Sequence, residues 1–200
     1  MDQSAGRRAR RRQETTDRLV TAAWSLFESQ GFEQVTMEAI AEAADVAKGT
    51  LYKHFPAKEA LLQQAFHREM HQTKPRLMAQ LEDVPAGKLR IREFFRISAE
   101  WSEQRRNYLP HYLRFRMNTQ GRSDQDRSGT DKVFRMLIEA GVKSGDFRQD
   151  LSLESAVHYL SFLYLAALVR WLDQPGSLLM EELDIMLDLF LSGIGISRDD

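Results

Sequence analysis

The stretch that decides the fold is ADVAKGTLYKHFPAKEAL, which runs from Ala44 to Leu61. It gathers small residues, an aromatic ring and several cationic side chains in a chain whose formal net charge is −1. Proline suits the first turn of a helix and moves the preceding residue out of helical geometry, so Pro56 separates two elements. The stretch predicts a short helix over residues 47–53 and the start of a longer one. It is either a solvated turn between helices or a surface that lies against phosphates.

Helical periodicity continues on the N-terminal side of this stretch. Apolar residues recur at three- and four-residue spacing between residues 18 and 27, which is typical of one face of a helix. Gly31 ends that helix, as glycine commonly does just past a helix terminus. Thr36 is a plausible N-cap for a short second helix with its inner stripe at Met37, Ile40 and Ala41. Three short helices with a tight break between the second and third make a helix-turn-helix pattern.

The C-terminal side is also helical, and no run shows the alternation of a strand. The fourth helix should run to about Leu81, with Pro75 kinking or splitting it. Further helices are predicted over 88–104, 107–121, 129–144, 152–173 and 178–193, with Ser152 as a cap. The fold class is therefore all-α with about nine helices. We divide it into a flexible Arg-rich arm (1–13), a helix-turn-helix DNA-binding domain (14–58) and a larger helical ligand-binding and dimerisation domain (59–200).

The composition narrows the class of protein. Of the 200 residues, 42% are hydrophobic and 28% are charged, as in an ordinary globular chain. The absence of cysteine excludes disulfides and thiolate metal sites and fits a cytoplasmic location. The basic N-terminus has no apolar segment behind it, and the apolar run 156–169 is too short to span a bilayer, so we expect no membrane partner. The arginines of residues 1–13 contrast with an acidic C-terminal quarter, which suggests that only one end meets a polyanion.

The helix-turn-helix pattern assigns roles within the opening stretch, because its third helix enters the major groove. Gly49 allows a close approach, and the methyl and hydroxyl of Thr50 can both touch a base, so Lys48, Gly49 and Thr50 are predicted to read bases. Phosphate contacts fix register without carrying sequence information. The complete predicted DNA surface is Thr36, Ala47, Lys48, Gly49, Thr50, Tyr52, Lys53, His54 and Lys58. Val46, Leu51, Phe55 and Leu61 are expected to form the core beneath it.

From Arg18 to Leu62 the sequence resembles the DNA-binding region of the tetracycline-repressor-like (TetR) family of transcriptional regulators. The shared pattern comprises Ala23, Phe27, Gly31, Thr36, Ile40–Ala41, Val46, Gly49–Tyr52, Phe55, Lys58–Glu59 and Leu61. Two departures stand out, because the family usually has serine where this chain has Ala47 and often has serine where it has Ala57. Each change removes a hydroxyl able to cap a helix, a loss of about 1 kcal/mol. Extra contacts from the Arg-rich arm offer one compensation.

The resemblance implies a homodimer that binds a double-stranded DNA operator. Family members typically dimerise through their last two helices as a four-helix bundle. The predicted interface is the apolar stripes of those two helices: Leu160, Leu163, Tyr164, Ala167, Leu168, Trp171, Leu183, Met186, Leu187 and Phe190. These stripes are equally compatible with an ordinary core. Small residues at 166, 167, 192 and 193 suit close helix packing.

The resemblance also implies a cavity for a small-molecule effector of unknown identity, whose occupation spreads the DNA-reading heads. The residues predicted to line it are Trp101, Tyr108, His111, Tyr112 and Phe115. Most aromatic residues of this region should simply fill the core. No cofactor and no metal site are expected, because HREMH (67–71) has its glutamate at the wrong position for a zinc hydrolase and lacks a third ligand.

The sequence thus predicts a ligand-responsive, sequence-specific transcriptional regulator, most simply a repressor, and not an enzyme. Two alternatives stay open. One is a helical binding protein or enzyme whose N-terminal helices are only structural. The other is a non-specific DNA-coating protein, which would show a steep salt dependence with little preference among sequences.

Overall fold

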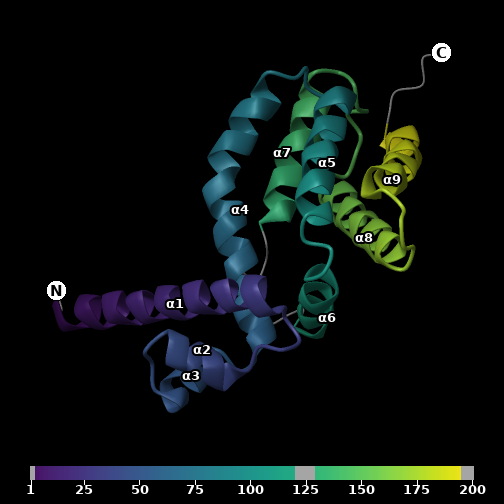
Figure 1. The fold of residues 1–200 in the computed structure, drawn as a ribbon. Coiled ribbons are helices and arrows are strands. Elements are labelled where there is room, and N and C mark those ends of the chain that lie inside the picture. Colours follow the sequence, from purple (N-terminus) through teal and green to yellow (C-terminus); the bar gives the residue numbers. More distant parts are fainter. Residues whose placement is uncertain (1–2, 120–128, 195–200) are drawn as a thin grey trace. The chain divides into compact units, whose positions relative to one another are not determined.

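The computed structural model describes residues 3–119 and 129–194, and every regular element in these ranges is a helix (Figure 1). The all-α prediction is confirmed. The helices of the described residues are α1 (Gln3–Gln30), α2 (Met37–Ala43), α3 (Lys48–His54), α4 (Lys58–Glu82), α5 (Lys88–Glu103), α6 (Leu109–Thr119), α7 (Thr130–Lys143), α8 (Leu153–Leu172) and α9 (Leu179–Ile194).

The described residues form two compact units. The N-terminal unit consists of residues 3–72 and 108–119, and the C-terminal unit consists of residues 73–107 and 129–194. The division falls inside α4 and not at residue 58, and α6 belongs to the N-terminal unit. The predicted boundaries of the DNA-binding domain therefore omit two elements that pack with it. Contacts between residues far apart in the sequence, which no local pattern reports, account for the difference.

Local chemistry explains the ends of the first helices. Gly31 takes a φ of +83° and its N–H donates to Phe27 O, which ends α1. Thr36 is the N-cap of α2, as predicted, and its Oγ1 accepts from Ala39 N at 3.1 Å. The turn between α2 and α3 holds Asp45 at a φ of +50°, a conformation that aspartate tolerates better than most residues. Ala47 is the N-cap of α3 and makes no side-chain cap bond.

A small apolar core lies beneath α2 and α3. Leu51 and Leu61 are fully buried and Phe55 nearly so, as predicted, whereas Val46 is only half-buried. These side chains meet the buried face of α1, made of Leu19, Val20, Ala23 and Phe27. The core holds the helix-turn-helix as a firm platform.

Residues 3–13 are helical and continue α1, which corrects the expectation of a flexible arm for that part; residues 1–2 lie outside the described ranges. Arginine, alanine, glutamine and glutamate are strong helix formers, and the packed part of α1 supplies the nucleus on which they propagate. Arg10 Nε lies 2.9 Å from Glu14 Oε1, one turn on. Gln13 Nε2 donates to Asp17 Oδ1 at 3.1 Å.

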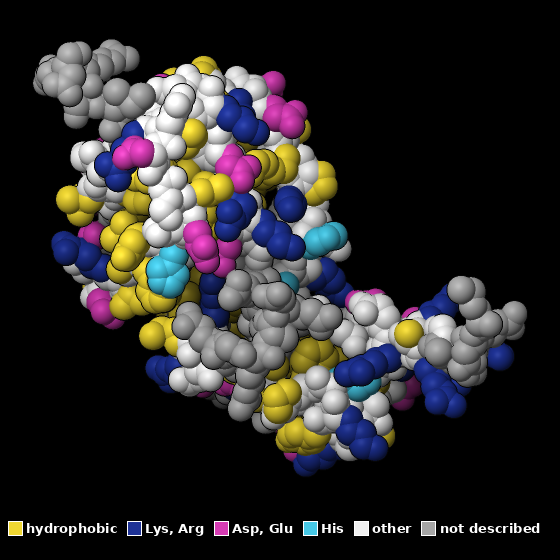
Figure 2. Space-filling view, turned by 180° about the vertical axis from the view of Figure 1, so that it is seen from behind, with side chains coloured by type: hydrophobic (Ala, Val, Ile, Leu, Met, Phe, Trp, Pro, Cys, Tyr) yellow, Lys and Arg dark blue, Asp and Glu magenta, His cyan; other side chains and the backbone are white. Residues whose placement is uncertain are grey.

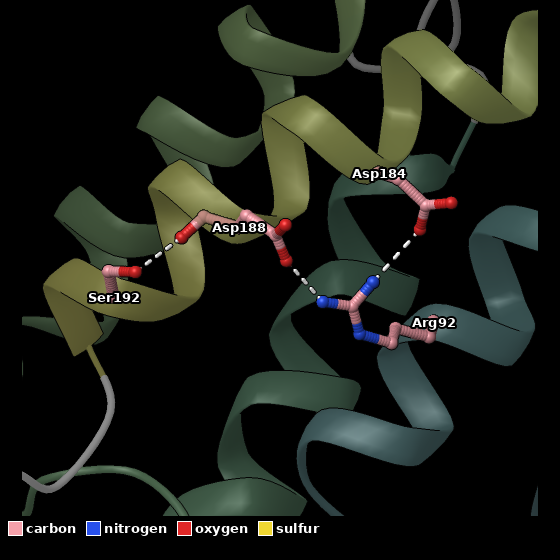
Figure 3. Close-up of polar contacts among 4 residues, drawn as sticks. All are labelled: Arg92, Asp184, Asp188 and Ser192. Atoms are coloured by element: carbon pink, nitrogen blue, oxygen red, sulfur yellow. Dashed lines mark hydrogen bonds and ion pairs between the residues drawn. The ribbon is translucent and has the colours of Figure 1, made fainter.

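The C-terminal unit packs α7 on α8, α8 on α9, and α5 on both α7 and α9. Its aromatic core brings the ring of Phe95 within 5.6 Å of Phe134 and 5.3 Å of Tyr164, measured between centroids. Gly141 leaves room for the ring of Phe147, because a Cβ there would collide with it. Arg92 on α5 reaches α9, with Nη1 2.9 Å from Asp184 Oδ1 and Nη2 paired with Asp188 (Figure 3).

The structure adds to two sequence expectations about individual helices. Pro75 does not split α4, which is assigned as one helix from residue 58 to residue 82, and a kink at Pro75 stays a prediction. Among the described helices, α8, which contains the apolar run 156–169, is long and apolar enough to cross a membrane by length and composition alone, with 20 residues and a mean hydropathy of 1.3. Core helices pass the same test, and α8 packs against α7 and α9.

Candidate nucleic-acid interface

The outer face of α3 carries most of the predicted DNA surface. Lys48, Gly49, Tyr52 and Lys53 are exposed and Thr50 is half-buried, while Leu51 on the opposite face is fully buried. The first turn of α3 has no acidic residue, and Lys53 lies in its last turn. Thr36 and Ala47 are also exposed, at the starts of α2 and α3. The structure therefore presents a short helix whose outer face is small, polar and cationic.

Gly49 has a feature that the fold does not require. It does not adopt a positive φ, and a Cβ built on it would meet no atom within 4 Å. Glycine inside a helix is less stable than alanine by roughly 0.5–1 kcal/mol. Since no atom of the chain excludes a methyl group here, the absence of a side chain at Gly49 is of use only to a binding partner that approaches α3 from outside.

Lys48 is held by a residue that the sequence analysis missed. Its Nζ forms an ion pair with Glu38 on α2, and both side chains are more than half exposed. The hydrogen bond from Lys48 lowers the pKa of Glu38, and the same bond raises the pKa of Lys48. An exposed pair of this kind is weak, so DNA can displace it. Glu38 sits one position after the first residue of α2, where an acidic residue also favours the helix dipole.

Lys58 has a different role from the phosphate contact predicted for it. Its Nζ donates to three backbone oxygens of the α1–α2 loop, Phe32 O at 2.7 Å, Glu33 O at 3.1 Å and Val35 O at 3.1 Å. It also lies 4.6 Å from the centre of the Phe32 ring. Because all three ammonium hydrogens are used, Lys58 fixes the loop that leads into Thr36. No local sequence pattern indicates this role, since the partners are 23–26 residues away.

His54 is also committed to packing. Its Nδ1 lies 3.1 Å from Thr16 Oγ1, so it joins the end of α3 to α1. Burial, and secondarily the charge of Arg12, lower the pKa of His54, which favours the neutral ring. The contact to Thr16 gives His54 a structural role, and a DNA contact by this residue stays a prediction. Arg18 takes part in the same junction, with Nη1 3.4 Å from Ala44 O.

The residues predicted to line an effector cavity belong to both units. Three of them, on or just before α6, pack within the N-terminal unit. Tyr108 OH donates to Phe27 O at 3.2 Å, and the His111 ring stacks on Phe32 with ring centroids 4.2 Å apart. Tyr112 is buried against Phe66. Trp101 belongs to the C-terminal unit, where the Arg105 guanidinium lies 4.5 Å from its ring centre. Phe115 is half-buried on α6. Aromatic residues occur in cores and in pockets alike, so a role of these residues in effector binding stays a prediction.

The predicted dimer stripe is mostly the inner face of α8 and α9. Leu160, Leu183 and Leu187 are fully buried within the chain. Ala167, Leu168, Trp171, Met186 and Phe190 are also buried, and Leu163 and Tyr164 are half-buried.

Trp171, one of the buried members, makes its contacts within the chain. Its Nε1 donates to Ser177 O at 3.0 Å, and the Arg106 guanidinium lies 4.3 Å from its ring centre while donating to Trp171 O. The opposite faces of the same helices are apolar and open. They expose Tyr159 (65%), Phe162 (51%) and Val169 (41%) on α8, and Ile185 (55%) and Leu189 (70%) on α9. Sequence periodicity reports two such stripes and does not say which one faces inward.

His67 and His71 do not form part of a larger ligand cluster. Within the described ranges, no three His, Cys, Asp or Glu side chains are grouped closely enough to hold a metal ion. His67 Nε2 lies 3.4 Å from Tyr112 OH, inside the N-terminal unit.

Comparisons with known proteins agree with this geometry. Residues 19–65 match the family model described as bacterial regulatory proteins, tetR family. The HTH-type transcriptional repressor KstR2 of Rhodococcus jostii is 26% identical over 94% of each chain. KstR of the same organism is 44% identical over 63 residues, about a third of this chain.

Solved structures place the fold in the same group. The FadR of Thermus thermophilus, a TetR-family transcriptional repressor crystallised with lauroyl-CoA, superposes with a TM-score of 0.73 at 27% identity, covering 92% of this chain and 96% of that one. The family model covers the helix-turn-helix, and the relatives extend the similarity over nearly the whole length. Residues 19–65 therefore match the tetR family of bacterial regulatory proteins, and the chain as a whole is similar in sequence and fold to TetR-family repressors.

Proposed function

We propose that the chain is a cytoplasmic, ligand-responsive transcriptional repressor that binds a palindromic DNA operator as a homodimer. The observation that carries the proposal is the outer face of α3, where Lys48, Gly49, Thr50, Tyr52 and Lys53 stand over a buried core. Lys48, Gly49 and Thr50 read base edges, and Tyr52 and Lys53 contact phosphates together with the start of α2 at Thr36. No catalytic role is assigned to any residue.

The proposal of a homodimer is based on the exposed apolar faces of α8 and α9. Their exposed apolar side chains repeat at helical spacing, at 159, 162 and 169 on α8 and at 185 and 189 on α9. Ala166, Ser192 and Gly193 are exposed on the same helices and allow close approach. An apolar surface of this kind on a soluble protein marks an interface, and a second copy buries it symmetrically.

The oligomeric state tests this part. We expect a mass near twice the chain mass of 23.2 kDa, and an Ile185→Arg, Leu189→Arg variant that is monomeric but folded. Leu89→Arg on α5 is the matched control, because Leu89 is 58% exposed outside the proposed interface. A double variant that stays dimeric would place the interface elsewhere.

The effector is proposed from the family and its relatives. FadR of Thermus thermophilus binds lauroyl-CoA, so acyl-CoA thioesters are the first class to test. A ligand moves an equilibrium only by its preference for one conformer, and a shift from 1:99 to 99:1 needs about 5.5 kcal/mol of differential binding. Titration of the protein–operator complex with acyl-CoAs of different length, and with free CoA as control, measures the release.

Selection of bound duplexes from a random pool tests the function as a whole. We expect a recovered site with two-fold symmetry, half-sites centred about one helical turn or a multiple of it apart, and two chains bound per symmetric site. Recovery of unrelated sequences at physiological salt would favour the DNA-coating alternative. Failure to retain any duplex would favour the alternative in which the N-terminal helices are only structural.

A further inference from the structure

The N-terminal part of α1 extends beyond the helix-turn-helix as an exposed helix that carries five arginines, at positions 7, 8, 10, 11 and 12 (Figure 1). All five are exposed. Figure 2 shows Lys and Arg side chains gathered along this projecting part and over the small domain below it. The extension is not held by a core, so its composition has to be explained by something other than packing.

The charges of the extension are sorted onto different faces. Residues three and four apart share a helix face, so Arg8, Arg11 and Arg12 lie together and continue towards Arg18. The other face holds Arg10 paired with Glu14, and Gln13 bonded to Asp17. Arg8, Arg11 and Arg12 have no ion pair with any carboxylate of the described residues. One face is neutralised within the chain and the other is left cationic.

The cationic face is directed towards the proposed DNA-reading helix. Arg18 reaches the α2–α3 turn at Ala44 O, and Arg12 is close enough to His54, at the end of α3, for its charge to act on that ring. Lys53, next to His54, is exposed. Cationic side chains are therefore present both at the end of α3 and on the part of α1 that leads to the extension.

This arrangement is unfavourable for the isolated chain. The N-terminal end of a helix carries a partial positive charge, and α1 has no acidic residue in its first turn. Arginines at positions three and four apart also repel one another. Each effect costs a few tenths of a kcal/mol, and both are reversed when the surface faces an anionic polymer.

We propose that Arg8, Arg11 and Arg12 form a second DNA contact, which binds the phosphate backbone beside the bases read by α3. This inference rests on the proposed function. Under this inference, the extension increases the affinity for DNA without reading its sequence, because the phosphates are the same at every base pair. It also offers a physical compensation for the missing cap hydroxyl at Ala47, where α3 makes no side-chain cap bond.

The salt dependence of binding tests the contact. Each neutralised phosphate adds about 0.9 to the slope of log K against log salt. Two chains bind each operator, so the full-length Arg8→Gln, Arg11→Gln, Arg12→Gln variant removes six phosphate contacts and should lose roughly 5 of that slope, while keeping its preference for the selected duplex over a scrambled one. Glutamine keeps the helix propensity, so the extension stays helical.

A matched pair of single variants separates the faces. Arg12→Gln removes one contact from each of the two bound chains and should lower the slope by about 1.8, whereas Arg10→Gln, on the neutralised face, should leave it unchanged. Amide hydrogen exchange across residues 7–13 should slow when the selected duplex binds. The inference is overturned if the wild-type protein discriminates between duplexes but the triple variant keeps the wild-type slope. A wild-type protein that does not discriminate at all overturns the proposed function, and the inference with it.

Discussion

Replacing Gly49 with alanine should make the free protein more stable and its DNA complex weaker. The added methyl group meets no atom within 4 Å, and Gly49 has no positive φ that alanine would strain. Gly49 is the second residue of α3. Alanine should therefore stabilise the N-terminal unit by roughly 0.5–1 kcal/mol, since it loses less backbone entropy on folding. Urea unfolding followed by circular dichroism measures this.

The effect on DNA has the opposite sign. If α3 lies against base edges at Gly49, the methyl group occupies space that the duplex needs. Forcing an extra methyl into a packed contact costs about 1–3 kcal/mol, which corresponds to a loss of roughly 5- to 150-fold in affinity. Fluorescence anisotropy with the selected duplex, at one fixed salt concentration, gives the ratio of dissociation constants.

Gly6→Ala is the control, because a Cβ at Gly6 also meets nothing within 4 Å and Gly6 lies far from α3 in the sequence. It should change DNA affinity by less than about twofold, within the usual range for surface substitutions. If Gly49→Ala stabilises the protein and leaves DNA affinity intact, α3 does not approach DNA at this position. If it destabilises the free protein, the assignment of open space is wrong.

Three further outcomes follow from the side-chain contacts. Lys58→Met removes three charge-assisted hydrogen bonds to the α1–α2 loop and should lower the free energy of unfolding by about 2–3 kcal/mol. Lys53→Met is the control, because Lys53 is exposed on α3, and it should change the free energy of unfolding by less than about 0.5 kcal/mol. Equal losses in the two variants would refute the role of Lys58 in fixing the loop. The pKa of His54 is lowered in the folded protein, so the unfolded chain binds more protons, and the stability present above about pH 6.5 should fall as the pH drops below that value. His54→Gln should make the stability less dependent on pH in this range. A pH profile of stability that is the same in the variant and the wild type would contradict the role of His54. Arg92→Ala breaks an exposed α5–α9 ion bridge and should cost no more than about 1 kcal/mol, a loss that shrinks in high salt; a salt-independent loss of several kcal/mol would contradict this assignment.

The parts of the fold that depend on neighbouring residues could be predicted from the sequence. Gly31 and Thr36 set the ends of α1 and α2 through bonds to residues three or four positions away, and both were identified correctly. The same holds for Ser152, whose side chain accepts from Ser155 N at the start of α8. A helix cap joins residues only three or four positions apart, so a local sequence pattern can predict it.

The parts of the fold that depend on contacts between residues far apart in the chain could not be predicted from the sequence. Lys58 is attractive as a phosphate ligand because it is cationic and lies next to the motif, yet its partners are loop carbonyls that only the fold brings near. The hydroxyl of Tyr108 donates to Phe27 O, 81 positions away, a contact that no local sequence pattern indicates. The helical arm was missed for a different reason, because a run of arginines gives no apolar periodicity even where it forms a helix.

The central claim is that α3 reads the operator, and a repeat of the random-pool selection with two matched variants tests it most directly. Lys48→Gln removes a predicted base contact, and Lys53→Gln removes a predicted phosphate contact from an exposed residue in the last turn of the same helix. The account predicts that Lys48→Gln changes the recovered bases at one symmetric pair of positions, while Lys53→Gln recovers the wild-type site with a salt slope lower by about 1.8, one phosphate for each bound chain. Recovery of the unchanged wild-type site by Lys48→Gln, with affinity also unchanged, would contradict it.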